Sequence, residues 1–293
     1  MKLAFKFLLL LIFVASASFF SCSSEECLLD DEPSLIVKFK FDPNQIRLNN
    51  LGQLSVIPEG NAAQTPDFKK ISAHYLEFAP TSITPLGQGT IVYHAPETDL
   101  GGAIAIDFSQ AKIVGNDEVF LKIPLKDIAS GSYEWVRASL TYQSGSIQIL
   151  NQGTTYSGTL DSFVGFRTYI GTHNIDNNVF PLNANKSQGY WAFALNGYPY
   201  ATSGQAPEGA TTVPNPIFST SPIPQGSCVV TGKFSNNLII TGTEKRDIVL
   251  ELSLSINKSF EWTEVTADGK YEPSIGEHVV DMGLRGLIPS YIK

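Results

Sequence analysis

Near the C-terminus, carboxylates and glycines alternate along a stretch that could bind a cation. The stretch covers residues 264–286 and contains Asp268-Gly269 early and Gly276-Glu277 later. Calcium takes about six to eight oxygen ligands from carboxylates, carbonyls and water, and acids spaced along a glycine-punctuated loop can supply them. The same residues also fit a β-hairpin turn at Asp268-Gly269 with solvated acids around it. The sequence leaves both interpretations open.

This stretch resembles the Asp-Gly-x-Tyr-x-x-Gly-Glu-x-x-x-Asp calcium loops of bacterial surface proteins. The resemblance implies that calcium is bound by these side chains: Asp268, Glu272, Glu277 and Asp281. The chain departs from the pattern at Pro273-Ser274-Ile275, because three residues separate Glu272 from Gly276 where one is usual. This insertion changes the geometry of the loop.

Histidines offer a second type of metal ligand. The chain has four of them: His74, His94, His173 and His278. His74 and Glu77 form a His-x-x-Glu, but strand residues three apart point to opposite faces, so we do not expect them to share a metal. His94 lies beside Glu97 and Asp99 and is the best histidine site of the four. A histidine on a half-buried strand is more often a hydrogen-bonded filler than a ligand.

Aromatic side chains are the other candidates for ligand contact. The three tryptophans lie in strand-like segments: Trp135, Trp191 and Trp262. Sugar-binding surfaces use exposed aromatics as stacking platforms, but large aromatics in strands usually belong to the core. Alternation puts Trp191 on one face with Phe193 and Leu195, which predicts burial. Tyr198 and Tyr200 begin a proline-rich segment and are the better candidates for exposed, ligand-binding residues.

The sequence lacks the short motifs of common enzyme classes. It has no Gly-x-Ser-x-Gly, no His-Glu-x-x-His and no glycine-rich phosphate loop. No pair of cysteines has metal-ligand spacing. A non-enzymatic role is therefore favoured, and motifs assign no catalytic residues. A hydrolase with carboxylates assembled from distant strands is an alternative.

Short runs of alternating apolar and polar residues predict that the candidate acids, histidines and aromatic residues are positioned by β-strands. Leu35, Val37 and Phe39 share one face of a first strand, and residues 247–257 alternate in the same way. Further strands are expected at residues 71–78, 89–93, 103–108, 119–123, 133–142, 146–150, 163–170 and 190–195. Many short strands at close spacing predict an all-β fold, an antiparallel β-sandwich of one domain or two packed β domains, with long Pro/Gly-rich loops.

Two segments give more local predictions. Residues 228–234 and 238–241 flank Asn236-Asn237, which predicts a hairpin and, with the strand after it, an antiparallel meander. Residues 198–226 contain six prolines. Because proline cannot donate to a strand ladder, we expect a long surface loop or an excursion along a sheet edge there, and a sub-boundary of the body near 198–226.

The N-terminus resembles a bacterial lipoprotein signal. Lys2 and Lys6 precede an apolar run over residues 7–20, and Ser21-Cys22 follows it directly. The run has the pattern of a signal peptide and is too short for a comfortable membrane span. The resemblance to a lipobox implies removal of residues 1–21 and lipidation of Cys22, although Phe19-Phe20 departs from the usual residues. Several acyl chains would anchor the protein to a membrane without a spanning helix.

The residues after Cys22 predict a flexible tether over 22–33 and a β-rich body over 34–293. The pair Glu25-Glu26 resembles the export tag of surface lipoproteins of the Bacteroidota type, which implies the outer leaflet of the outer membrane. It also fits a plain solvated tether. With Cys22 lipidated, Cys27 and Cys228 remain as a disulfide candidate, but Cys228 lies in an apolar run and could equally be a buried free thiol.

The net charge of the chain limits the classes of molecule that it is expected to bind. The chain has 20 basic and 28 acidic residues and a net charge of −8, which the loss of Lys2 and Lys6 brings near −10. Binding of phosphate backbones needs clustered Lys and Arg, so we expect no nucleic-acid partner. The remaining partners are the membrane, through the lipid anchor, and an external glycan or an outer-membrane protein.

The order of several short sequence segments is faintly similar to that in the MbnP-type copper-associated lipoproteins. The segments are an opening apolar strand, Gly131-Ser132-Tyr133, and Gly189-Tyr190-Trp191 before Gly197-Tyr198. The similarity implies calcium or copper binding as an alternative function, without a ligand set. The leading hypothesis is a non-enzymatic, lipid-anchored envelope or cell-surface protein that binds a glycan or protein, or scaffolds an outer-membrane partner.

Overall fold

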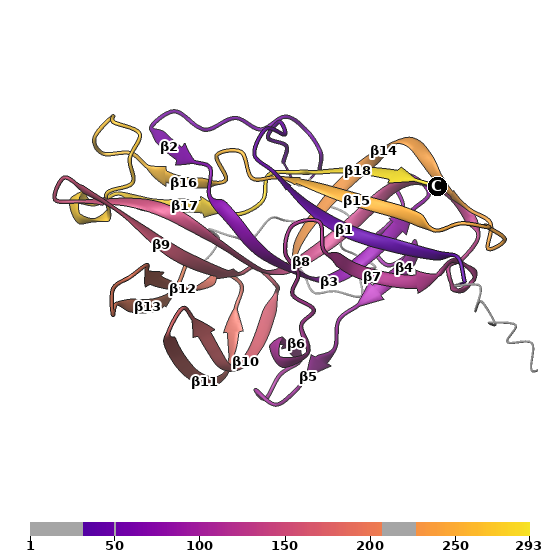
Figure 1. Cartoon of the computed structure of the whole chain (residues 1–293), viewed down its shortest axis with the longest axis horizontal. Coiled ribbons are helices and arrows are strands. Elements are labelled where there is room, and N and C mark those ends of the chain that lie inside the picture. The colour runs from indigo at the N-terminus through magenta and orange to yellow at the C-terminus, as the bar shows by residue number, and fades with distance from the viewer. Residues whose placement is uncertain (1–31, 50, 207–226) are drawn as a thin grey trace, which may run out of the picture. The chain divides into compact units, whose positions relative to one another are not determined.

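The computed structural model describes residues 32–49, 51–206 and 227–293, and its regular secondary structure consists mostly of strands (Figure 1). Strands make up 59% and helices 4% of the structure, so the prediction of an all-β fold is confirmed. Pro33–Lys293 form one compact unit. In the part of the chain that the structure describes, no helix is long and apolar enough to cross a membrane.

One layer of the sandwich is a sheet of four strands in the order β18-β15-β1-β7. Its strands are β1 (Ser34–Asp42), β7 (Val119–Pro124), β15 (Ile248–Ser255) and β18 (Leu287–Ile292). The first strand, β1, pairs in parallel with β15 and antiparallel with β7. This pairing joins the two ends of the body in a single sheet.

The second layer belongs to a sheet of seven strands. Its path is β13 (Ala201–Gln205), β12 (Tyr190–Leu195), β9 (Thr154–Phe163), β8 (Gly131–Asn151), β3 (Asp67–Ala79) and β4 (Thr90–His94), and β14 (Cys228–Ile240) also pairs with β8. The 21-residue strand β8 organises this sheet, because its first half pairs with β14 and its second half with β9. Both halves pair with β3.

The main core lies between these two layers. Alternate residues of β15 are fully buried there, including Ile248, Leu250 and Leu252, and they pack with the inward face of β1. Val136 and Ala138 from the first half of β8 complete this core from the other layer. The period of two that predicted these strands therefore also predicted which face is buried.

Within the described ranges, two small sheets and three short 3-10 helices accompany the two layers. One sheet contains β17 (His278–Met282), β16 (Phe260–Thr263) and β2 (Asn61–Gln64). The other contains β11 (Asn178–Ser187), β10 (Arg167–Ile175), β6 (Ala105–Asp107) and β5 (Glu97–Thr98). The 3-10 helices are η1 (Phe108–Gln110), η2 (Leu125–Asp127) and η4 (Pro273–Ile275). Phe260 and Trp262 of β16 pack with Ile147 of β8 and Phe193 of β12 in a second core.

Several local predictions are wrong because tertiary pairing decides where a strand ends. Residues 228–240 form one strand, and Asn236-Asn237 lies at a register shift rather than in a hairpin turn. The C-terminal third is no meander, since β15 pairs with β1 and β18 while β14 pairs with β8. Residues 133–142 and 146–150 belong to the single strand β8, and residues 164–166 separate β9 from β10. The proline-rich segment begins with an edge strand, β13, and its residues 207–226 lie outside the described part.

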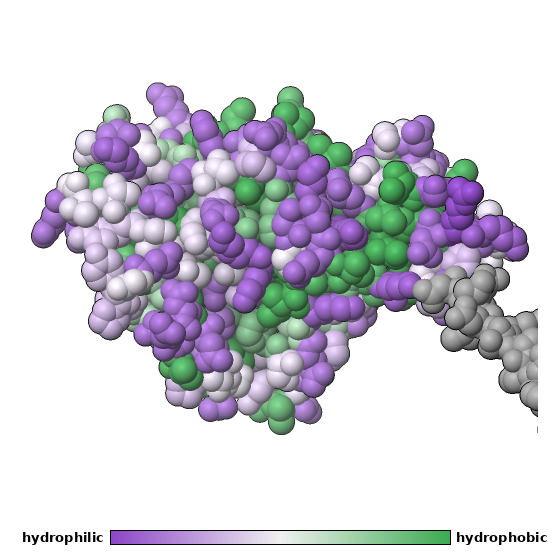
Figure 2. Space-filling model, in the orientation of Figure 1, coloured by the Kyte–Doolittle hydropathy of each residue, from purple (hydrophilic) through white to green (hydrophobic). Residues whose placement is uncertain are grey.

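Hydrophobic residues also reach the surface. Figure 2 shows polar residues over much of one face and a group of hydrophobic residues where β1, β4 and β7 lie in Figure 1. Exposed apolar side chains on these strands include Ile91 and Val119, each 46% exposed. Single exposed apolar residues are normal, so this patch by itself assigns no function.

Candidate functional site

A cavity of about 870 Å³ lies between the second half of β8, with β9, β12 and β13, and the strands β16 and β17. Three alternate residues at the C-terminal end of β8 line it: Ile147, Ile149 and Asn151. Leu160 of β9 and Met282 of β17 add apolar surface from two other strands. Because these strands come from distant parts of the sequence, the cavity exists only in the folded chain.

Aromatic rings form much of the cavity wall, and two glycines make room for them. A Cβ atom on Gly204 would lie 2.6 Å from the ring of Trp191, its cross-strand partner on β12. A Cβ atom on Gly158 would lie 2.1 Å from the ring of Phe193. Each ring therefore occupies the space next to a glycine of a neighbouring strand. Trp191 lines the cavity on the same face as Phe193, as the alternation predicts, but it is half-buried rather than part of the core.

Tyr198 and Tyr200 lie at the edge of the cavity. Each is 54% exposed, and each contributes to the lining. The rings of Tyr198 and Tyr156 are in edge-on contact, with centroids 5.7 Å apart. The predicted exposure of the two tyrosines is thus observed, and the cavity gives them a shared surface. Their role in binding a ligand stays a prediction.

The loop after β16 closes one side of the cavity and is held by a buried acid. Glu277 is 1% exposed, and its two carboxylate oxygens accept hydrogen bonds from the backbone N–H groups of Val265 (3.1 Å) and Glu272 (2.6 Å). Tyr271 of the same loop packs against Phe260, with ring centroids 5.1 Å apart. Burial, with the charge of Glu277, raises the pKa of Tyr271 above its ordinary value. This phenol therefore stays neutral at physiological pH.

The structure does not bring the four predicted calcium ligands together. Asp268 accepts a hydrogen bond from the backbone of Lys270, and Glu277 is occupied by backbone N–H groups. Asp281 lies on β17 and forms an ion pair with Arg285. Among the residues that the structure describes, no three of these acids have ligand oxygens that all lie within 4.8 Å of one another. The calcium prediction therefore gains no support from the geometry.

Carboxylates from distant strands do meet beside the cavity, but arginines neutralise them. Glu261 faces Asp281 across the β16–β17 pair. Glu261 lies 3.0 Å from Arg47 and 3.8 Å from Arg285, and its side chain is 6% exposed. A hydrolytic pair of carboxylates needs one member free to donate or accept a proton. These contacts form a structural charge network, and they do not favour the hydrolase alternative.

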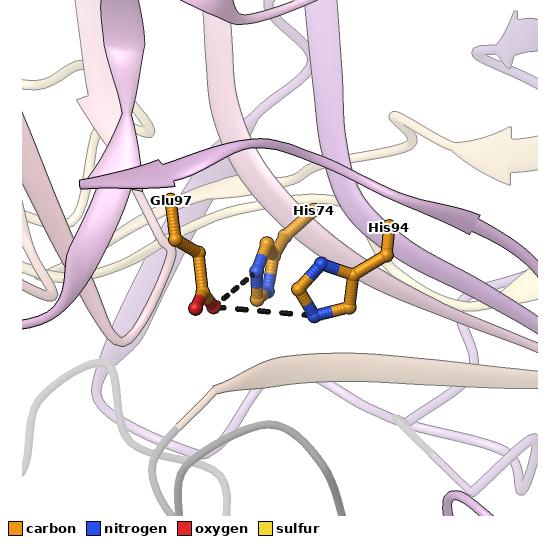
Figure 3. A group of neighbouring side chains, drawn as sticks. All are labelled: His74, His94 and Glu97. Carbon is orange, nitrogen blue, oxygen red and sulfur yellow. Dashed lines mark hydrogen bonds and ion pairs between the residues drawn. The ribbon is translucent and has the colours of Figure 1, made fainter.

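Three side chains that could bind a metal meet where the chain passes from the large sheet to a small one (Figure 3). His74 comes from the middle of β3, His94 ends β4, and Glu97 begins β5. One ligand atom from each lies within 4.8 Å of the others. His74 Nε2 is 2.9 Å and His94 Nε2 is 3.9 Å from the same oxygen, Glu97 Oε1.

Sequence reasoning found only part of this cluster. It paired His94 with Glu97, but it missed His74 because spacing along a strand says nothing about contact across strands. The side chain of His74 is fully buried, whereas those of His94 and Glu97 are 37% and 29% exposed. Burial, with the neighbouring His94, lowers the pKa of His74 from 6.5 to about 3. His74 does not meet Glu77, whose carboxylate accepts a hydrogen bond from Tyr75 and binds the backbone of the next loop.

The other two histidines have different environments. His173 is 3% exposed and lies 2.8 Å from Asp161, so it is a buried, hydrogen-bonded residue of the kind expected for strand histidines. His278 is exposed and lines the cavity. Neither belongs to a group of three metal-binding side chains in the described ranges.

Cys228 has no disulfide partner within the described residues. Burial, with the charge of Asp281, raises the pKa of its thiol from 9.0 to about 12. Cys22 and Cys27 lie outside the described part of the chain, so the lipidation and the disulfide both stay predictions.

Comparison with known proteins returns no match: no family model, no curated protein and no solved structure is similar to this chain. The cavity and the histidine cluster therefore have to be interpreted from their own chemistry.

Proposed function

We propose that this protein binds a small, largely apolar ligand in the cavity between β8, β9, β12, β13 and β16–β17. The observation that carries the proposal is the size and lining of the cavity, which is about 870 Å³ and walled by aliphatic and aromatic side chains. Sites for small molecules are typically of about 300–1,000 Å³, mostly apolar, with a few polar groups that orient the ligand. Gln205 and His278 are polar residues of this lining.

The lining favours an apolar ligand over a glycan. A sugar can stack on an aromatic ring, but its hydroxyl groups need hydrogen-bond partners once they leave water. Along much of the lining they would meet apolar side chains such as Ile147, Leu160 and Phe193 instead. The carboxylate of Glu277 already accepts two backbone hydrogen bonds. A hydrocarbon or aromatic ligand has no such cost, and it gains about 25 cal/mol for each Å² that it removes from water.

A substitution that fills the cavity with a large side chain tests the proposal. Ile149→Trp places a large ring inside the cavity, whereas Thr155→Trp places the same ring on an exposed position of β9. The apolar dye N-phenyl-1-naphthylamine should bind the unsubstituted protein and Thr155→Trp with equal affinity. Ile149→Trp should weaken binding at least tenfold while the melting temperature stays near that of the control. Equal binding by all three proteins would refute the site.

The glycan alternative has its own measurement. A panel of soluble polysaccharides is titrated while tryptophan fluorescence is recorded, since Trp191 lines the cavity. The ligand would be a glycan rather than an apolar molecule under two conditions. The unsubstituted protein would have to bind a polysaccharide saturably and not bind the dye, and Ile149→Trp would have to abolish the polysaccharide binding. Lack of any response agrees with the proposal.

We further propose that the body is held at the bacterial envelope by lipids on Cys22. The support is the signal-like N-terminus, with Lys2 and Lys6 before the apolar run and Ser21-Cys22 after it. Anchoring by several acyl chains does not require a spanning helix. Labelling of cells with an alkyne analogue of palmitate should mark the unsubstituted protein and leave Cys22→Ala unmarked. Protease treatment of intact cells then determines whether the body faces the exterior.

A further inference from the structure

We propose that His74, His94 and Glu97 form a binding site for a divalent transition-metal ion, with Zn²⁺ as the type case. The site is separate from the proposed ligand cavity, because none of the three residues lines it. It combines two imidazole nitrogens and one carboxylate oxygen. This donor set is one that zinc uses with three protein ligands and a fourth position for water or another ligand.

The three ligand atoms lie close to the spacing that a tetrahedral ion requires. Zinc bonds of about 2.0–2.1 Å at tetrahedral angles place two ligand atoms about 3.3 Å apart. The distances from Glu97 Oε1 to His74 Nε2 and His94 Nε2 are 2.9 and 3.9 Å, and all ligand atoms lie within 4.8 Å. To surround one ion, each nitrogen–oxygen distance has to change by about half an ångström, and the two nitrogens have to approach each other by at most about 1.5 Å.

The orientation of His94 is fixed for this role. Its Nδ1 lies 3.0 Å from the carbonyl oxygen of Ala95, so Nδ1 carries the proton and donates it. The lone pair of Nε2 is then free and faces Glu97 (Figure 3). A hydrogen bond from the second ring nitrogen to a carbonyl is the usual support of a metal-binding histidine. The Ala95 backbone is itself held, because its N–H donates to the carbonyl of His74 at 2.7 Å.

His74 supplies the buried side of the site. Its ring contacts His94, with centroids 4.6 Å apart, and Phe166, at 5.5 Å. The Nδ1 atom is buried and has no hydrogen-bond partner, so in the metal-free protein the ring proton is on Nε2, which donates to Glu97. Metal binding at Nε2 moves that proton to Nδ1. The ring stays neutral, and its tautomer reports on the metal.

A metal ion can enter the site directly from solvent. His94 and Glu97 are partly exposed, so an ion can reach the cluster without opening the core. Two of the three ligands are nitrogens, which favours transition metals over calcium, an ion that prefers oxygen ligands. Zinc should therefore bind in the presence of excess calcium.

The test is calorimetric titration of the metal-free protein with ZnCl₂, followed by NMR. We expect one zinc ion per chain and, on binding, a change of His74 from the Nε2–H to the Nδ1–H tautomer in long-range ¹H–¹⁵N spectra. His94→Ala and Glu97→Gln change partly exposed residues and should keep the fold. Each should weaken zinc binding by at least about 100-fold, because loss of even an outer-shell partner typically costs 10- to 100-fold.

Two variants provide matched controls. Asp99→Asn removes an exposed acid two residues from Glu97, and His278→Ala removes an exposed histidine elsewhere. Both should bind zinc as the unsubstituted protein does. The proposal is overturned if no zinc binds, if His94→Ala and Glu97→Gln bind it normally, or if binding is lost in His278→Ala. A zinc-independent tautomer of His74 would also overturn it.

Discussion

Replacement of Tyr198 by alanine should weaken ligand binding by about tenfold. A whole aromatic side chain can bury about 200 Å². Since Tyr198 is 54% exposed at the edge of the cavity, about 110 Å² of it is free for a ligand to cover. At about 25 cal/mol per Å², complete cover contributes about 2.7 kcal/mol, or roughly 100-fold in Kd. If the ligand covers half of this area, the loss of the side chain raises Kd about tenfold.

The fold should tolerate the change. The backbone hydrogen bonds of this turn, from Tyr198 N–H to Leu195 and from Tyr200 N–H to Tyr198, do not involve the side chain. Titration with N-phenyl-1-naphthylamine measures Kd, and a thermal melt checks the fold. Tyr198→Phe keeps the ring and should stay within about twofold of the unsubstituted protein. Ile83→Ala removes an apolar side chain that is 82% exposed and outside the lining, and it should have no effect.

The reasoning is refuted if Tyr198→Ala binds the dye as tightly as the unsubstituted protein while Ile149→Trp does not bind it. That combination would place the ligand in the cavity but away from its edge. Equal weakening by Ile83→Ala would show that the dye reports on general surface hydrophobicity rather than on this site.

Three other perturbations test the site and its support. Gly204→Val should displace the ring of Trp191, since even a Cβ atom there would lie 2.6 Å from it, and we expect a shifted tryptophan emission and at least tenfold weaker dye binding. Glu261→Gln should lower the free energy of unfolding in urea by about 3 kcal/mol, because it leaves a buried arginine without its counter-charge. The matched change at the partly exposed Glu251 should cost less than about 1 kcal/mol, and equal costs would contradict the argument. Because the pKa of Cys228 is about 12, its alkylation by iodoacetamide at pH 8 should be roughly a thousandfold slower than that of an ordinary thiol and should rise tenfold per pH unit up to pH 11. Peptide mass spectrometry measures this rate, and rapid labelling at pH 8 would show that the pKa of the thiol is not raised.

Local patterns in the sequence determined where several of the strands form and which of their faces are buried. The alternation in β1 and β15 predicted both, because a strand has a side-chain period of two wherever it pairs. The same rule placed Trp191 and Phe193 on one face, and the position of Tyr198 at the start of the long proline-rich segment correctly indicated that Tyr198 is exposed. These properties depend on near neighbours in the chain.

Only the tertiary structure decided which strands pair and therefore which side chains meet. The parallel pairing of β1 with β15 joins residues about two hundred positions apart, and no local pattern specifies it. The cavity exists because the second half of β8 extends beyond the sandwich and is covered by β16 and β17. Strand pairing likewise brings His74 of β3 next to His94 at the end of β4 and Glu97 of β5. Contact across strands follows from register and sheet packing, which the whole chain determines, whereas spacing along one strand determines only the face on which a residue lies.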